Sequence, residues 1–275
     1  MIVLLIAGGW YLLETRIAQP AMIYMGLPAQ KTEAIRLTRV LRNDHFMVGY
    51  SEWLGNPLWV SYQVLPEPAQ SRGGPRPGRF QADWRSLRCI TVIACVDHEQ
   101  YSGSGHDRGH LAPNHLIASR HGPRAQGQTF LMTNVSPQRP DLNQGPWRAL
   151  EALAAGPLAE RHAPFWVITG PVFDRERIRH LPGLARIAEP DAFYKIFIRE
   201  AGNQPVALAF LMPQSAGRDA DPFAFLTSIR EIERQTGLDF FHELPDEVET
   251  GLETTITPDA WDLEILIGDG AVTSH

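Results

Sequence analysis

Only two of the 275 residues are cysteines, and no apolar run is long enough to span a membrane as a helix. Cys89 and Cys95 are too few for the disulfide framework that stabilises small secreted domains. They form either one bridge or a pair of small buried apolar side chains. Basic residues are not in excess either, because 25 Lys and Arg face 31 Asp and Glu, for a net charge of -6. This balance excludes a protein that wraps nucleic acid mainly by bulk positive charge.

The chain begins with an uncharged apolar stretch, MIVLLIAGGWYLL, over residues 1–13. Its length is typical of the hydrophobic part of a signal peptide, although it lacks the preceding basic residues and a clear cleavage site. We expect export to the periplasm or medium, or attachment to a membrane through residues 1–13. The alternative is a buried first element in a cytoplasmic protein.

Repeats of 20–50 residues are absent from the sequence, which excludes solenoids and propellers. The phosphate-binding pattern G-x-x-x-x-G-K-[ST] and the nucleophile elbow G-x-S-x-G are also absent. A zinc site could be drawn from Cys89, Cys95, His98 and His106, but this spacing matches no common zinc pattern.

Strands and helices alternate without the regular rhythm of a parallel sheet. Apolar, β-branched or aromatic runs predict six strands, at residues 58–64, 89–96, 129–135, 165–169, 193–198 and 206–212. Two helices are predicted at 146–153 and 222–236, the second ended by Gly237, and Pro and Gly make 66–79 a loop. We therefore expect an α+β fold with a central, mainly antiparallel sheet flanked by helices. One domain is expected over 21–253, between an apolar segment, 1–20, and a C-terminal tail, 254–275.

The densest chemical segment is YSGSGHDRGHLAPNH, residues 101–115. Within it, residues 105–110 hold two imidazoles, a carboxylate, a guanidinium and two glycines. Histidine suits proton transfer near neutral pH, and arginine presents a planar set of donors to phosphate. The segment predicts phosphate chemistry, with a polar loop held by an Asp–Arg pair as the alternative.

A second segment, NVSPQRPDLNQGPWRALE, covers residues 134–151. Asn143 precedes a turn and a helix start, and Glu151 lies about two helical turns further on. An amide oxygen and a carboxylate near one helix face are hard ligands that suit Mg²⁺ or Mn²⁺. The alternative is an Asn that caps a helix and a Glu on the surface.

Taken together, these segments make the chain resemble the DNA/RNA non-specific endonucleases with a ββα-metal (His-Me finger) core, especially the endonuclease G-like branch. The resemblance covers roughly residues 50–245 and also includes NPLWVSY, FWVITGPVF, PDAFYKIFI, ALAFLMPQ and IREIERQTGLDFFHELP. It implies a metal-dependent endonuclease that cuts DNA and RNA to 5′-phosphate products.

The resemblance also implies roles for individual residues. His110 matches the general base, Asn143 the single protein ligand of a Mg²⁺ ion (Mn²⁺ as an alternative), and Glu151 an outer carboxylate that holds metal-bound water. Arg108 matches an arginine at the scissile phosphate. Asn134 matches an asparagine that orients the catalytic centre.

Three further positions match the family pattern less directly. Asp107, the first residue of DRGH, matches a positioning carboxylate. A family arginine that contacts phosphate corresponds to either Arg76 or Arg79. His106 departs from the family pattern, either as a second titrating group or as a surface residue.

The net charge conceals a local concentration of arginine. Residues 72–88 hold five arginines against Asp83, and residues 120–148 hold four against Asp141, whereas acidic residues gather after Glu231. This pattern predicts salt-sensitive contact with DNA and RNA through a few arginines. Rival interpretations are a nucleic-acid-binding relative without catalysis and a nuclease toxin with an immunity partner. Homodimerisation is the alternative to a monomer.

Overall fold

The computed structural model describes residues 19, 21–30, 38–70, 72–90, 95–174 and 176–263. The apolar segment 1–13, with its predicted export or anchoring role, lies outside these residues. None of the helices within them is long and apolar enough to cross a membrane.

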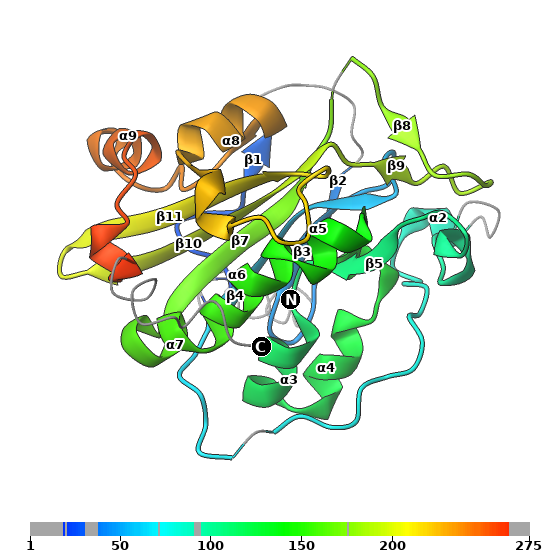
Figure 1. Ribbon diagram of the computed structural model, residues 1–275, viewed down its shortest axis with the longest axis horizontal. Helices are drawn as coiled ribbons and strands as arrows, with labels where there is room; N and C mark the ends of the chain where they lie inside the picture. The colour runs from blue at the N-terminus through cyan, green and yellow to red at the C-terminus, as the bar shows by residue number, and fades with distance from the viewer. Residues whose placement is uncertain are drawn as a thin grey trace, which may run out of the picture.

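A seven-stranded antiparallel sheet forms the centre of the molecule (Figure 1). Its strand order is β12-β11-β10-β7-β4-β3-β2. The long strands alternate buried side chains between the two faces, so both faces need a covering layer. The strands are β2 (Thr38–Arg42), β3 (Met47–Ser51), β4 (Asn56–Val64), β7 (Phe165–Val172), β10 (Ala192–Ala201), β11 (Gln204–Pro213) and β12 (Leu226–Thr227). Four of the predicted strands are therefore confirmed, and the α+β class with them.

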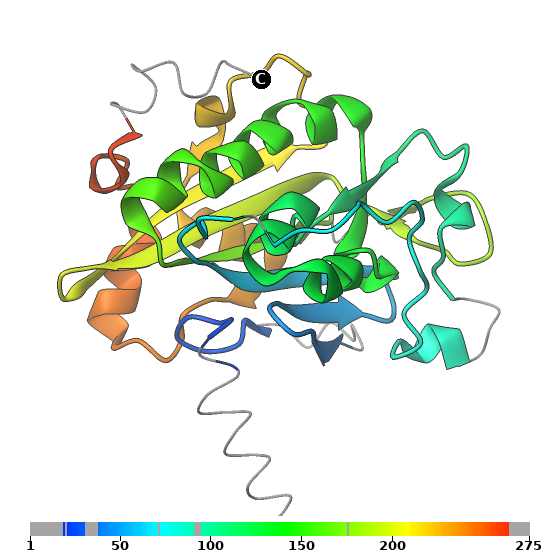
Figure 2. The ribbon, with the colours of Figure 1, turned by 90° about the horizontal axis from the view of Figure 1, so that it is seen from below.

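Helices cover the two faces of the sheet separately (Figure 2). On one face, Trp147 and Leu150 of α6 and Leu116 of α3 pack with Tyr62 and Phe197 of the sheet. On the other face, Ile232 of α8 and Leu252 of α9 belong to a second apolar cluster. The helices are α3 (Asn114–His121), α4 (Pro123–Thr129), α6 (Pro146–Ala155), α7 (Pro157–His162), α8 (Ile229–Thr236) and α9 (Asp246–Thr254).

A small antiparallel pair projects from the main sheet beside α5 (Pro140–Gln144). Strand β5 (Asp107–His110) is the DRGH segment, and it pairs with β6 (Val135–Gln138), so that His110 faces Val135. The chain then continues through α5 into α6, which gives a ββα unit on the edge of the domain. Short elements complete the fold: β1 (Ala29–Gln30), β8 (Arg179–His180), β9 (Ala188–Glu189), β13 (Leu238–Asp239), and the 3₁₀ turns η2 (Glu99–Tyr101), η3 (Met132–Asn134), η4 (Pro222–Phe225) and η5 (Asp259–Trp261).

The strand predicted at 89–96 is wrong where the structure describes it. Leu87–Ile90 is a helical turn, α2, because the Glu52 carboxylate accepts from the backbone N–H of Leu87 and Arg88. These side-chain bonds outweigh the β propensity of the segment. Cys89 is joined to Cys95 by a disulfide, so the bridge is the correct alternative of the two.

The strand predicted at 129–135 is also wrong. Its first residues end α4 and form the turn η3, and β6 begins only at Val135. Asn134 stabilises this turn, since its side chain donates to the carbonyl of Thr129. The helix predicted at 222–236 is shorter than expected: Asp221 caps η4, Ser228 caps α8, and Gly237 ends α8 with a φ of 68°.

The boundaries predicted for the domain stay predictions. The described part of the segment after residue 253 packs onto the domain, because Trp261 is fully buried against Phe165 and Phe197. Trp261 and Leu263 therefore belong to the core.

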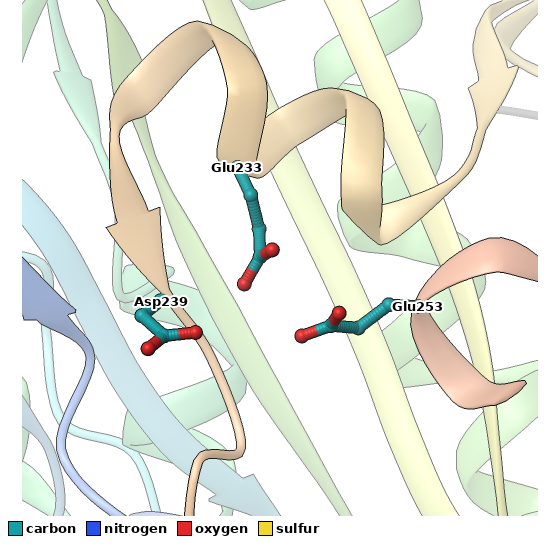
Figure 3. Close-up of side chains that lie close together, drawn as sticks. All are labelled: Glu233, Asp239 and Glu253. Atoms are coloured by element: carbon teal, nitrogen blue, oxygen red, sulfur yellow. The ribbon is translucent and has the colours of Figure 1, made fainter. Parts of the chain in front are cut away.

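Three carboxylates meet on the α8–α9 face, and they form the one such group among the described residues (Figure 3). Oxygens of Glu233, Asp239 and Glu253 lie within 4.8 Å of one another. Arg230 provides a counter-charge, with its guanidinium 2.7 Å from Glu253. Burial, followed by the charge of Glu233, raises the pKa of Glu253 to about 7.

Candidate active site

A cleft of about 620 Å³ opens where the ββα unit meets α3. Predicted site residues from three separate segments of the chain line it together. Its walls are formed by Arg76, Arg108, His110, Pro113, Asn114, His115, Leu116, Asn143, Gln144, Arg148, Glu151 and Ala152. The cleft combines five arginine or histidine side chains with amide and carboxylate groups of α3, α5 and α6.

His110 stands at the end of β5 between two aromatic rings. The ring centroids of Phe80 and Phe130 each lie 4.9 Å from its imidazole. Its Nε2 is buried and has no hydrogen-bond partner among the described residues. Burial, helped by the charge of Arg76, lowers the pKa of His110 to about 3. The imidazole is therefore neutral near pH 7, which is the form that can accept a proton.

Asp107 connects β5 to α5. Its Oδ2 accepts from Asn143 Nδ2 and from Gln144 Nε2, each over 2.8 Å. Because the amide nitrogen of Asn143 is held in this way, its Oδ1 points away from Asp107, and no hydrogen bond from the described residues engages that oxygen. The predicted positioning carboxylate thus orients the predicted metal ligand. Asn143 caps no helix, so the capping interpretation is wrong.

Two motif glycines are required by close packing. A Cβ at Gly109 would lie 2.0 Å from Gln138 Oε1 on the paired strand. A Cβ at Gly145, between α5 and α6, would lie 2.3 Å from the carbonyl oxygen of Arg218 and 2.5 Å from that of Asp141. The Gln138 side chain would have to move at Gly109, and the backbone itself would have to move at Gly145, so these glycines let the two motifs approach their neighbours.

Glu151 lies on the cleft side of α6, one turn after Trp147. It is not a surface glutamate: its side chain is 24% exposed, and Lys195 Nζ lies 3.7 Å from its Oε1. Burial raises the pKa of Glu151, while the charge of Lys195 opposes that rise. The carboxylate therefore has one side in the protein and one side toward the cleft.

The structure distinguishes Arg76 from Arg79, which the sequence leaves as alternatives. Arg76 lines the cleft and lies over the Phe130 ring, 5.6 Å from its centroid. Arg79 instead forms an exposed ion pair with Glu99 over 2.8 Å and does not line the cleft. Arg108 lines the cleft with its guanidinium held by the carbonyl of His98, at 3.0 Å from Nε.

Asn134 lies below the cleft rather than in its wall. It is fully buried, and its amide both accepts from the backbone N–H of Ala112 and donates to the carbonyl of Ala112, at 2.9 and 3.1 Å. All of its polar atoms are used by the protein. Asn134 therefore fixes the backbone just after His110 and has no polar atom left for another partner.

His106 is partly enclosed, with 10% of its side chain exposed. Its Nε2 lies 3.4 Å from Glu189 and its Nδ1 lies 3.1 Å from the carbonyl of Ser104. His106 therefore links the chain just before β5 to β9. The zinc site weighed for Cys89 and Cys95 is excluded, because both sulfurs are in the disulfide.

Comparisons with known proteins show the family to which the chain belongs. The family model described as DNA/RNA non-specific endonuclease matches residues 27–247. Human mitochondrial endonuclease G is 31% identical over 216 residues, which cover 74% of this chain and 70% of the relative. A nuclease of Serratia marcescens is 30% identical over 204 residues, covering 71% and 72%. The chain belongs to the DNA/RNA non-specific endonuclease family. It is a hydrolase that acts on nucleic acids.

A solved structure supports the fold of this family member. The crystal structure of an EndoG/EndoGI complex, on the mechanism of EndoG inhibition, matches with a TM-score of 0.67 at 21% identity. The match covers 82% of this chain and 90% of the solved one. Family membership also favours a divalent metal.

Several cleft residues were not singled out from the sequence. Gln144 and Arg148 lie inside the second motif, so their closeness to Asn143 and Glu151 was a usable signal. His115 lies two residues after Pro113, and α3 begins at Asn114 and carries His115 into the cleft. Lys195 gave a different signal: it is a charged residue within the apolar strand FYKIFI.

Proposed function

We propose that this family member is a metal-dependent, sugar-non-specific endonuclease that hydrolyses phosphodiester bonds of DNA and RNA and leaves 5′-phosphate ends. One observation carries the proposal. A single cleft brings together the unpartnered imidazole of His110, the oriented amide of Asn143 and the guanidinium groups of Arg76 and Arg108. These groups bind phosphate, none of them reads a base, and the nucleic-acid backbone is common to DNA and RNA.

His110 is the general base of the proposed reaction. Its neutral imidazole takes a proton from a water molecule that attacks phosphorus in line with the leaving 3′ oxygen. Burial weakens this base in the free protein, and a phosphate anion in the cleft would raise its proton affinity by attraction. Arg108 and Arg76 place donors beside the phosphate, where they stabilise the negative charge that grows in the transition state.

The donors in the cleft fit one hard divalent cation, and we propose Mg²⁺, with Mn²⁺ as the alternative. Asn143 Oδ1 would be its protein ligand, and the Glu151 carboxylate would hold water of its hydration shell. When bound, such an ion polarises the phosphate and neutralises charge on the leaving oxygen. Because Asn143 is neutral, the site leaves most of the ion's charge available to the phosphate.

The test is digestion of plasmid DNA and of RNA over a series of Mg²⁺, Mn²⁺ and EDTA concentrations, followed by end-group analysis. We expect cleavage of both polymers with metal, none with excess EDTA, and 5′-phosphate ends. Activity unaffected by EDTA would contradict the metal assignment. Binding without cleavage under every condition would favour the non-catalytic relative.

For the location of the protein we propose an oxidising compartment reached by export through residues 1–13. The supporting observation is the Cys89–Cys95 disulfide, since such bonds persist mainly outside the reducing cytosol. Thiol alkylation of fractionated cells tests this: protected cysteines outside the cytoplasm are expected, and free thiols in a cytoplasmic protein would contradict it. Homodimerisation, and binding of a protein inhibitor or immunity partner, stay predictions.

A further inference from the structure

Lys195 is a fully buried lysine on β10, directly beneath the proposed active site. Of the 25 basic Lys and Arg residues in the chain, only Lys31 and Lys195 are lysines. The Lys195 side chain is 0% exposed and comes from the middle of the central sheet, opposite Thr169 and Phe210. Lysine is almost never fully buried unless it is paired, because moving an ammonium group out of water is costly. The buried ammonium group of Lys195 therefore needs a partner that offsets the cost of removing its charge from water.

That partner is Glu151. Lys195 Nζ lies 3.7 Å from Glu151 Oε1 and 4.1 Å above the centre of the Trp147 ring. Trp147 and Glu151 are one turn apart on α6, so the helix presents an aromatic face and a carboxylate to the same ammonium. The ammonium therefore holds the carboxylate from the side opposite the cleft.

The polar atoms around this pair are incompletely satisfied. Among the described residues, Lys195 Nζ, Glu151 Oε1 and Trp147 Nε1 are buried atoms without a hydrogen-bond partner, as is the hydroxyl of Tyr62. Burial penalises the charged form of both partners, and their mutual attraction opposes this penalty. An ion pair of this kind adds little net stability, and a purely structural role would be filled as well by apolar side chains.

We propose that Lys195 is a positioning residue of the nuclease site, which holds the Glu151 carboxylate in the orientation that serves the hydration shell of the divalent ion. This inference rests on the proposed function. Without the ammonium group, the side of Glu151 that faces the protein would have only the Trp147 ring beside it, and nothing there would keep the carboxylate turned toward the cleft. Lys195 itself reaches neither the substrate nor the ion.

The experiment measures Mn²⁺ binding by electron paramagnetic resonance in the His110→Ala background, with and without a short DNA duplex. Lys195→Met keeps the length of the side chain and removes the charge. Its Mn²⁺ dissociation constant is expected to rise about 10- to 100-fold, as for other residues that orient a metal site. In the otherwise native protein, the Mg²⁺ concentration for half-maximal cleavage should rise by the same factor.

Glu151→Gln should have a similar effect, and the double variant should bind Mn²⁺ within about 3-fold of either single variant, because both changes act through one carboxylate. Arg120→Met is the matched control. Arg120 is another buried cation, 3% exposed, but its guanidinium is held by the carbonyls of Leu65 and Ala155 and by Ser119. It should leave Mn²⁺ binding unchanged.

A Lys195→Met protein that binds Mn²⁺ like its parent would overturn the proposal, as would fully additive effects of the two changes. If Lys195→Met does not fold, Lys195→Gln and the uncharged double variant carry the same comparison. The proposed function fails separately, because a native chain that binds Mn²⁺ but cuts no nucleic acid contradicts the nuclease mechanism while the Mn²⁺ comparison still tests Lys195.

Discussion

Asp107 holds the amide nitrogen of Asn143 at 2.8 Å, and this bond decides which end of the Asn143 amide faces the cleft. A carboxylate can only accept from Asn143, so the oxygen of the amide is left for a cation. The first residue of DRGH and the Asn of LNQG are 36 positions apart in the chain, and they act as one unit.

Asp107→Asn should therefore weaken the metal site without removing a ligand. The new amide can donate to Asn143 and lets it turn its nitrogen toward the cleft. We expect the Mg²⁺ concentration for half-maximal cleavage to rise about 10- to 100-fold. The control is Asp141→Asn on α5, the helix that carries Asn143. Asp141 is exposed and paired with Arg218, and its substitution should leave the Mg²⁺ dependence unchanged. Equal effects of the two changes would contradict the orienting role.

Arg76 and Arg79 offer a second matched pair. Arg76 lies in the cleft and Arg79 is paired with Glu99 outside it. Arg76→Ala should lower kcat/KM on a short duplex about 10- to 100-fold, the loss expected for one charge-assisted hydrogen bond. Arg79→Ala should change it less than about 3-fold, as befits an exposed ion pair. A larger loss at Arg79 would reassign the phosphate contact.

Much of this site could be predicted from the sequence because its chemistry is local. His110, Asp107 and Arg108 lie within one strand, and Asn143 and Glu151 within two consecutive helices, so short motifs carry most of the geometry. The long strands were equally clear, since runs such as residues 165–169 consist of aromatic and β-branched side chains.

The features that the sequence did not predict depend on contacts between distant segments of the chain. The helical turn at Leu87–Ile90 is set by Glu52, and the turn at 132–134 by the side chain of Asn134, which propensity alone does not register. The choice between Arg76 and Arg79 depends on the position of Phe130, and the pairing of Lys195 with Glu151 on the packing of α6 against β10.

The buried His110 should make the protein less stable in acid. Its pKa is about 3 when folded against 6.5 for an ordinary histidine, so the unfolded chain binds more protons between these values. The unfolding free energy should fall as pH decreases from 6.5 to 3, by up to ~1.4 kcal/mol per pH unit. His110→Gln should lack this contribution, and urea titrations of both proteins measure it. Parallel stability curves would contradict the burial of a neutral imidazole.

Glu253, which lies on the other face of the sheet, should have the opposite effect on the pH dependence of stability. Its pKa is raised from 4.5 to about 7, so the folded protein binds the extra proton in this window. Stability contributed by the protonated carboxyl is lost as pH rises from 4.5 to 7, by up to ~1.4 kcal/mol per unit. As pH rises from 4.5 to 7, the unfolding free energy of Glu253→Gln should therefore increase relative to that of the native protein. Chemical denaturation of both proteins measures this difference. A constant difference between the two proteins would show that folding does not raise the pKa of Glu253.

The most direct test of the account compares the native protein with His110→Ala on one labelled DNA duplex, with cleavage and binding measured in the same Mg²⁺ buffer. The account predicts that cleavage falls by at least about 10²-fold, the contribution of a general base, while the dissociation constant for DNA stays within about 3-fold. Cleavage by His110→Ala at the native rate would contradict the assignment of this cleft as the active site.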